Sequence, residues 1–177
     1  MGRGQAPKPP PASPAPKDQP LVVNGWSLFI WTDLANRWRA LKAEVERLRV
    51  QDREGYVRAP ATKMLAMLAA LMFREIPADP DAKEYRQGHT LGKPFAHWRR
   101  AKFFRRFRLF FRFHSKHRAI VYAWLNDETT LRRAGARTDP YAVFAGMLAR
   151  GQPPDNFEVL LRASVALRRD EVPNDTP

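Results

Sequence analysis

WRRAKFFRRFRLFFRFHSKHRAIVYAWL, residues 98–125, is the stretch on which the predicted fold depends. Within residues 107–113, large apolar side chains occupy every odd position, and two arginines and a phenylalanine occupy the even ones. Successive side chains of a strand leave opposite sides of the pleat, so this period of two predicts a half-buried strand. We expect helices to cover the odd positions. Arg108, Phe110 and Arg112 are expected to form an open face that is basic and aromatic.

Two neighbouring segments are predicted to pair with this strand. Residues 96–103 also alternate, and residues 104–106 would form the hairpin turn, although they lack the Gly or Asn that such turns favour. After a polar turn at 115–118, the apolar run 119–125 is rich in β-branched and aromatic residues. Such a run is typical of a central strand covered on both faces. The prediction is a small antiparallel sheet of three to four strands.

Helices are predicted before and after the sheet, from apolar residues at steps of three and four. A connecting loop of functional length is expected at 77–96. This order predicts an α+β fold in which the sheet packs on N-terminal and C-terminal helices. The expected helices are 34–48, 61–76, 131–134, 138–151 and 155–165, the last using Phe157, Leu160, Leu161 and Val165.

Three regions are predicted along the 177 residues. Residues 1–20 are rich in Pro and Ala and hold no aromatic residue, which is typical of a disordered or polyproline tail. Residues 21–170 suit one domain with a hydrophobic core, and 171–177 read as a polar tail.

Composition narrows the possible partners and the compartment. Lys and Arg number 31 against 18 Asp and Glu, and a net charge of +13 points to a polyanion, most often nucleic acid. An acidic protein partner would also fit. The absence of cysteine excludes disulfides and thiolate metal sites. No apolar run reaches the ~18 residues of a membrane helix and no secretory signal is evident, so we expect a cytoplasmic protein without a membrane partner.

Basic residues run from Arg99 to Arg118 without one intervening acid. Arginine binds phosphate oxygens bidentately, and interleaved aromatic residues stack on unpaired bases, a role expected here for Trp98, Phe104 and Phe110. The histidines could supply an acid–base pair, yet their spacing fits no metal motif and we interpret them as exposed turn or strand residues. No phosphate loop, nucleophile elbow or carboxylate cluster is present, so any catalysis is expected to need neither metal nor cofactor. The histidines are His89, His97, His114 and His117.

Motifs spread over residues 22–155 carry a resemblance to a known family. They include Asn24-Gly25-Trp26, Arg86 with Gly88, Trp98 with Arg100 and Lys102, Arg108 to Arg112, Asn126-Asp127-Glu128, Thr130-Leu131-Arg132, Thr138-Asp139, Tyr141 and Pro153-Pro154. In these the chain resembles the YhaV family, the toxins of type II toxin–antitoxin systems within the RelE/ParE-like fold group. The long Pro-rich front and the glycine-free hairpin turn depart from the family pattern.

The resemblance implies a RelE-like fold and an endoribonuclease that cleaves mRNA, either on the ribosome or free. It also implies neutralisation by a PrlF-type antitoxin whose AbrB-like domain binds operator DNA on behalf of the complex. A basic active surface then predicts that an acidic or aromatic antitoxin segment lies across it or blocks it indirectly.

Site residues follow from the same resemblance together with the chemistry of RNA cleavage. A ribonuclease must align a ribose 2′-OH with its phosphate and stabilise the charge that builds on the phosphorane. Arg108 and Arg112 are expected to stabilise phosphate, and Lys102 and Arg100 to activate the 2′-OH or assist the leaving group. The remaining expected roles are catalytic for Arg132 and Tyr141, RNA-binding for Trp98, Arg105, Arg106, Phe110 and Arg86, and orienting for Asp127 and Glu128.

Two other functions remain open at this point. One is a non-catalytic RNA-binding or ribosome-binding protein that uses the same basic sheet. The other is a ParE-like inhibitor of DNA gyrase, because folds are shared by toxins with different activities. The Arg and Lys set on the sheet favours a nuclease over a gyrase inhibitor.

Overall fold

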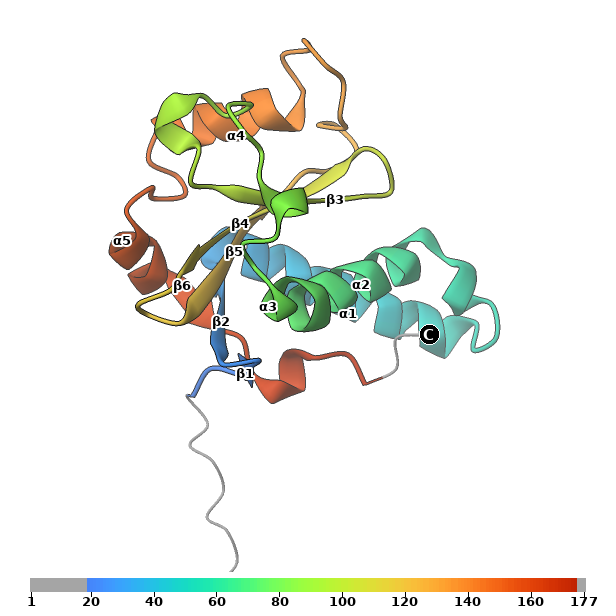
Figure 1. The fold of residues 1–177 in the computed structure, drawn as a ribbon. Coiled ribbons are helices and arrows are strands. Elements are labelled where there is room, and N and C mark those ends of the chain that lie inside the picture. The colour runs from blue at the N-terminus through green and yellow to red at the C-terminus, as the bar shows by residue number, and fades with distance from the viewer. Residues whose placement is uncertain (1–18, 175–177) are drawn as a thin grey trace, which may run out of the picture.

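The computed structural model describes residues 19–174 as a mixed sheet with helices on both faces (Figure 1). The predicted tail at 1–20 lies almost wholly outside the described residues. The strands are β1 (Val22–Val23), β2 (Trp26–Trp31), β3 (Arg99–Phe103), β4 (Phe107–His114), β5 (Ala119–Leu125) and β6 (Ser164–Ala166). The main helices are α1 (Thr32–Gln51), α2 (Pro60–Ala70), α3 (Ile76–Ala78), α4 (Pro140–Ala149) and α5 (Phe157–Arg162).

The sheet has six strands in the order β1-β2-β5-β4-β3, with β6 also paired to β2. The predicted strands at 96–103, 107–113 and 119–125 are confirmed as β3, β4 and β5, and the two hairpin pairings between them are antiparallel. The expectation of a wholly antiparallel sheet of three to four strands is wrong, because β2 runs parallel to β5. Asn24 and Gly25 both have positive φ, which forms the tight turn between β1 and β2.

Both faces of the sheet are buried. The odd positions of β4 pack with α1 and α2, as expected, in a core that includes Leu109 and Phe111. The even-numbered face is not open: Phe110 packs beneath α4 in a second core and stacks on Phe144 with ring centroids 4.3 Å apart. The prediction of an exposed basic, aromatic platform is therefore wrong. Figure 1 shows α4 lying across this side of the sheet, opposite α1 and α2.

The helices agree with the sequence except near the C-terminus. The helix at 61–76 is present as α2, a π-helical segment over Leu71–Glu75 and α3. No helix forms at 131–134, where the segment instead bonds to the β3–β4 hairpin through Arg132 N and Arg106 O, 3.1 Å apart. The last helix ends at Arg162, and Val165 belongs to β6, because the chain turns back to pair with β2.

Two further findings concern the hairpin turn and the polar end of the chain. Phe104 and Arg105 adopt positive φ without glycine, a conformation that costs an L-residue about 1 kcal/mol. Glu171, expected in a polar tail, is buried and bonds to Lys42 of α1 at 3.4 Å. None of the helices in the described region is long and apolar enough to span a membrane.

Candidate active site

The hydroxyl of Tyr141 is the point where two of the predicted arginines meet. It accepts hydrogen bonds from Nε of Arg100 at 2.7 Å and from Nε of Arg108 at 3.2 Å. Arg100 is on β3 and Arg108 on β4, and alternation places both on the α4 side of the sheet. All three residues are at least nine-tenths buried. The remaining bonds of the arginines go to backbone carbonyls of Glu84, Arg105 and Phe107.

Asp139 fixes Tyr141 and a third arginine from a separate segment. Its carboxylate caps α4 by accepting from the backbone N of Tyr141 at 3.0 Å, and Pro140 occupies the first helical position. The same carboxylate binds the guanidinium of Arg132 in an ion pair. This bond holds the Arg132 guanidinium over the Tyr141 ring, 5.1 Å from its centroid. Asp139 was expected only to begin a helix; the helix-capping signal did not reveal its second partner.

Asn126, the residue that follows β5, also supports the cluster. It is fully buried, and its Oδ1 accepts from the backbone N of Arg108 at 2.6 Å. Its Nδ2 donates to the carbonyl of Arg106 at 3.0 Å and to that of Thr130 at 2.9 Å. These bonds tie the loop after β5 to the start of β4, and so place the Arg132 segment beside the buried arginines.

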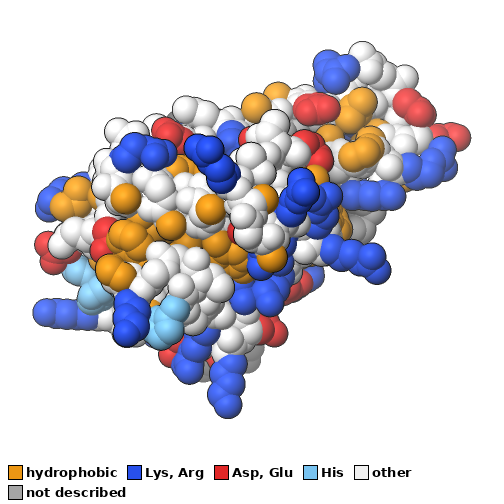
Figure 2. Space-filling model, turned by 90° about the horizontal axis from the view of Figure 1, so that it is seen from above, with side chains coloured by type: hydrophobic (Ala, Val, Ile, Leu, Met, Phe, Trp, Pro, Cys, Tyr) orange, Lys and Arg blue, Asp and Glu red, His pale blue; other side chains and the backbone are white. Residues whose placement is uncertain are grey.

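A hollow of about 430 Å³ opens beside the exposed edge of this cluster. Lys102 is on β3, directly opposite Arg108 in the strand register, and its side chain is exposed. The residues that line the hollow are Thr90, Arg132, Ala134, Gly135, Ala136, Arg137, Asp139, Tyr141 and Ala142. Figure 2 views the molecule from the α4 side, where apolar side chains occupy the middle and Lys and Arg side chains project around them.

Arg112 does not join the Tyr141 cluster. Its Nη1 donates to the carbonyl of Asp155 at 2.6 Å, and its guanidinium lies against the rings of Trp98 and Phe157. Burial lowers the pKa of Arg112 from its ordinary value, while the charge of Asp155 opposes that shift. The structure therefore separates the two arginines that were expected to grip one phosphate.

Two of the predicted base-stacking residues have no exposed ring face. Trp98 and Phe110 are both fully buried, and Trp98 Nε1 donates to Asp155 Oδ1 at 2.8 Å. The expectation that they stack on RNA is contradicted in this conformation, because α4 and the 153–157 segment cover them. Phe104, which has 45% of its surface exposed at the hairpin tip, is the aromatic residue of that group that is open to a base.

The other predicted RNA-binding side chains are at the surface. Arg105 and Arg106 are exposed on the β3–β4 hairpin. Arg86 is exposed too, and it forms an ion pair with Asp81 at 3.2 Å, a carboxylate that also binds Arg99. The hydrogen bond from Arg99 is the main reason that the pKa of Asp81 lies below its usual range.

Asp127 and Glu128 do not orient these cations. The carboxylate of Asp127 accepts from Thr129 and Thr130, and the Thr129 hydroxyl is the main cause of its lowered pKa. Both acids line a different cavity, on the α1 and α2 side of the sheet. The two acids are therefore not placed to orient the Tyr141 cluster, where Asp139 supplies the carboxylate.

Two of the histidines, His114 and His117, lie side by side at the turn between β4 and β5. The rings of His114 and His117 have centroids 4.6 Å apart, and both pack against Phe157. Both belong to the β4–β5 hairpin, whereas Phe157 comes from α5, so the local sequence does not indicate the contact with Phe157. In the described part of the chain, no three His, Asp or Glu side chains are grouped so that they could hold a metal ion.

Comparisons with known proteins give a consistent result. Residues 28–165 match a family described as a toxin with endonuclease activity, of toxin-antitoxin system. The chain is 43% identical over 147 residues to the ribonuclease toxin YhaV of Escherichia coli K12, covering 82% of this chain and 96% of that one. It is also 43% identical to toxin YhaV of Escherichia coli O6:H1, over 81% of this chain and 94% of the other. No solved structure matches it.

Proposed function

Because this chain belongs to the YhaV family of toxins, we propose that it is an endoribonuclease whose active site is the hollow beside Tyr141. The observation that carries the proposal is the convergence of Arg100, Arg108 and Arg132 on one tyrosine from three separate segments. Burying guanidinium groups costs desolvation free energy, and such clusters of charged groups are frequent at functional sites. A phosphodiester is the substrate whose negative charge these cations would stabilise.

The buried and exposed members of the cluster have different roles in this proposal. Arg100 and Arg108 are positioning residues, because their guanidinium groups are already bonded to Tyr141 and to backbone carbonyls. In both of these bonds the Tyr141 oxygen is the acceptor, so its O–H group is proposed to donate to a phosphate oxygen. Arg132, whose side chain is about one-third exposed, is the phosphate-stabilising cation at the hollow.

Cleavage then needs only the substrate's own nucleophile. The 2′-OH loses its proton and attacks the adjacent phosphorus, the bond to the 5′-oxygen breaks, and that oxygen takes up a proton. The products are a 2′,3′-cyclic phosphate and a 5′-OH. Lys102, exposed beside Arg108, is the group proposed to carry a proton from the 2′-OH to the leaving 5′-oxygen, and Tyr141 or Arg132 to offset the phosphorane charge. Arg105, Arg106 and Arg86 would hold the flanking phosphates from the surface.

The finer features rest on the family resemblance. They are a RelE-like fold, mRNA as substrate with or without the ribosome, and neutralisation by a PrlF-type antitoxin with an AbrB-like DNA-binding domain. Operator DNA would be reached only through the antitoxin complex. A cytoplasmic location follows from that substrate, since mRNA and ribosomes are found there.

The test compares two possible active sites within one chain. Purified toxin is incubated with a defined mRNA, with and without ribosomes, and new RNA ends are mapped. Arg132→Ala and Lys102→Ala are each expected to slow cleavage at least 100-fold, roughly the effect of removing one transition-state donor and one proton-transfer group, respectively. The paired histidines serve as the matched control, and His114→Gln with His117→Gln should retain most of the activity.

The outcomes separate the alternatives. If the histidine variants lose cleavage and the Tyr141-cluster variants keep it, the active site lies at the β4–β5 hairpin instead. Intact RNA together with co-sedimentation on ribosomes would favour a non-catalytic binding protein. Inhibition of DNA supercoiling by purified gyrase would favour a ParE-like toxin.

A further inference from the structure

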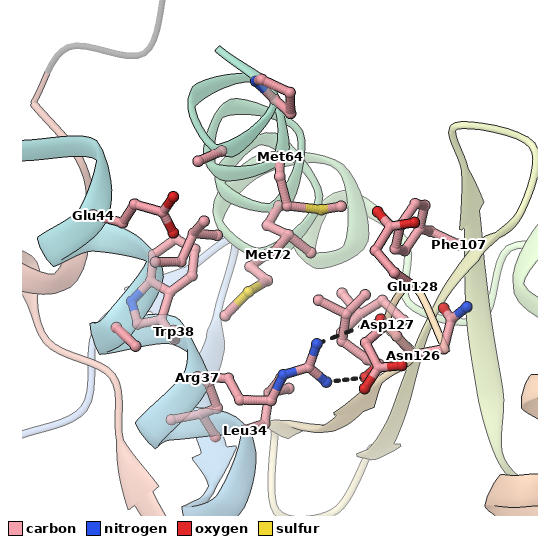
Figure 3. Close-up of a pocket in the computed structure, with 18 residues that line it drawn as sticks. Leu34, Arg37, Trp38, Glu44, Met64, Met72, Phe107, Asn126, Asp127 and Glu128 are labelled. Atoms are coloured by element: carbon pink, nitrogen blue, oxygen red, sulfur yellow. Dashed lines mark hydrogen bonds between the residues drawn. The ribbon is translucent and has the colours of Figure 1, made fainter. Parts of the chain in front are cut away.

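A second concavity lies on the face of the sheet opposite the candidate active site. It has a volume of about 560 Å³ and is formed by α1, α2 and the ends of β4 and β5. Figure 3 shows its interior lined by Leu34, Trp38, Met64, Met72 and Phe107. Its size falls in the range of roughly 300–1,000 Å³ typical of binding pockets, and methionine-rich linings adapt well to an inserted side chain.

The net charge of the residues that line this groove is opposite in sign to the net charge of the whole chain. The chain carries +13, yet the charged residues that line the groove are Glu44, Asp127, Glu128 and one cation, Arg37. In Figure 3, Glu44 and Glu128 stand on opposite sides of the opening, and both are exposed. Neither of these two glutamates has an ion pair with any residue between 19 and 174.

Arg37 does not offset this acidic rim for an incoming ligand. Its guanidinium is already bonded to the backbone carbonyls of Leu125 and Asn126 and faces Asp127. Burial lowers its pKa from the ordinary value, with the charge of Asp127 acting in the opposite direction. An RNA phosphate at this groove would therefore meet two unpaired carboxylates and an apolar wall, so nucleic acid is excluded as its occupant on electrostatic grounds.

We propose that the groove between α1 and α2 binds an antitoxin segment that inserts large apolar side chains and places Lys or Arg beside Glu44 and Glu128. An amphipathic helix in an apolar groove is a common mode of peptide recognition, and complementary charge at the rim selects the partner. The inference rests on the antitoxin named under the proposed function, but not on which residues cleave RNA. It places the antitoxin away from the basic surface, which corresponds to the indirect of the two modes of blocking expected from the sequence.

The occupant of this groove would touch the loop that supports the candidate active site. Asn126 lines the groove, and the same residue bonds to the backbone of Arg108 and Arg106. An antitoxin bound here would therefore contact the connection between β5 and the Arg132 segment without covering the hollow.

Binding of the purified product of the antitoxin reading frame beside this gene tests the proposal, measured by titration calorimetry. Ala40 and Ala43 are both exposed on α1, but only Ala40 lines the groove. Ala40→Trp is expected to weaken binding at least tenfold, and Ala43→Trp less than threefold. Glu44→Lys is expected to weaken binding several-fold, whereas Glu54→Lys, which changes the net charge equally at another exposed site, should not.

RNA cleavage and thermal unfolding are measured on the same variants. The proposal predicts that Ala40→Trp and Glu44→Lys fold normally and cleave RNA at the wild-type rate while they escape the antitoxin. Unchanged antitoxin affinity in a folded Glu44→Lys variant would overturn it, as would loss of binding on Arg105→Glu alone. A wild-type protein that binds antitoxin at the groove but cleaves no RNA would overturn the proposed function and leave this inference standing.

Discussion

Replacing Tyr141 by Phe removes one oxygen and leaves the aromatic ring in place. Both Arg100 and Arg108 then lose the acceptor for Nε, in a site where Arg100 is 7% and Arg108 is 6% exposed. A hydrogen bond to a charged group contributes roughly 1.5–3 kcal/mol. Because the two bonds share one oxygen and each guanidinium keeps bonds to backbone carbonyls, we expect a combined loss of about 3 kcal/mol in the free energy of unfolding.

Urea denaturation followed by circular dichroism measures this loss. Tyr122→Phe is the comparison, since the hydroxyl of Tyr122 donates a single neutral bond to the carbonyl of Met72 at 2.5 Å. That bond should contribute about 1 kcal/mol. The contact of Arg132 with the ring of residue 141 survives the substitution, so the assay isolates the hydroxyl. If Tyr141→Phe costs no more than Tyr122→Phe, the two arginines are not held by this oxygen and the proposed division of roles fails.

Three further substitutions probe the structure. Asn126→Ala removes three hydrogen bonds of a buried side chain and should destabilise the fold by about 3 kcal/mol in urea titration. A loss under about 1 kcal/mol would mean that the loop is held by other contacts. Arg105→Gly relieves the strain of a positive φ of 61° and should stabilise the fold by up to about 1 kcal/mol. The same variant should bind RNA more weakly in filter assays. A destabilised variant would contradict this account of the turn. Burial raises the pKa of Tyr85 to about 12, so the unfolded chain ionises first and stability should fall as pH rises from about 10 towards 12. Tyr85→Phe should reduce that alkaline loss, and an unchanged pH profile would refute the assignment.

Local pattern predicts most of the elements correctly. The alternation in β4 correctly assigns Leu109 and Phe111 to one side of the sheet and Arg108 and Phe110 to the other. The helical periods of α1, α2 and α4 are also read correctly. The sequence patterns do not predict strand β2, although Asn24-Gly25 immediately before it is a strong hairpin signal.

The candidate site is only partly visible in the sequence. Resemblance selects Arg100, Arg108, Arg132 and Tyr141, and these four side chains do meet. Resemblance also selects Arg112, which binds Asp155 elsewhere, and it gives Asp139 no role beyond the start of a helix. Partners of this kind come from segments tens of residues apart, and single-sequence patterns carry no information on such pairings.

Residue patterns along the chain are enough to predict the α+β class, the hairpins of the sheet, the side of the strand on which each residue lies, and a strong positive charge. What covers each side depends on tertiary packing, because the alternation of a strand defines two faces but not the helix that packs on either of them. α4 therefore hides Phe110 and Trp98, and the parallel pairing of β2 with β5 joins segments that about ninety residues of chain separate. The acidic groove beside α1 arises in the same way, since packing brings Glu44 of α1 beside the same groove as Asp127 and Glu128, which follow β5.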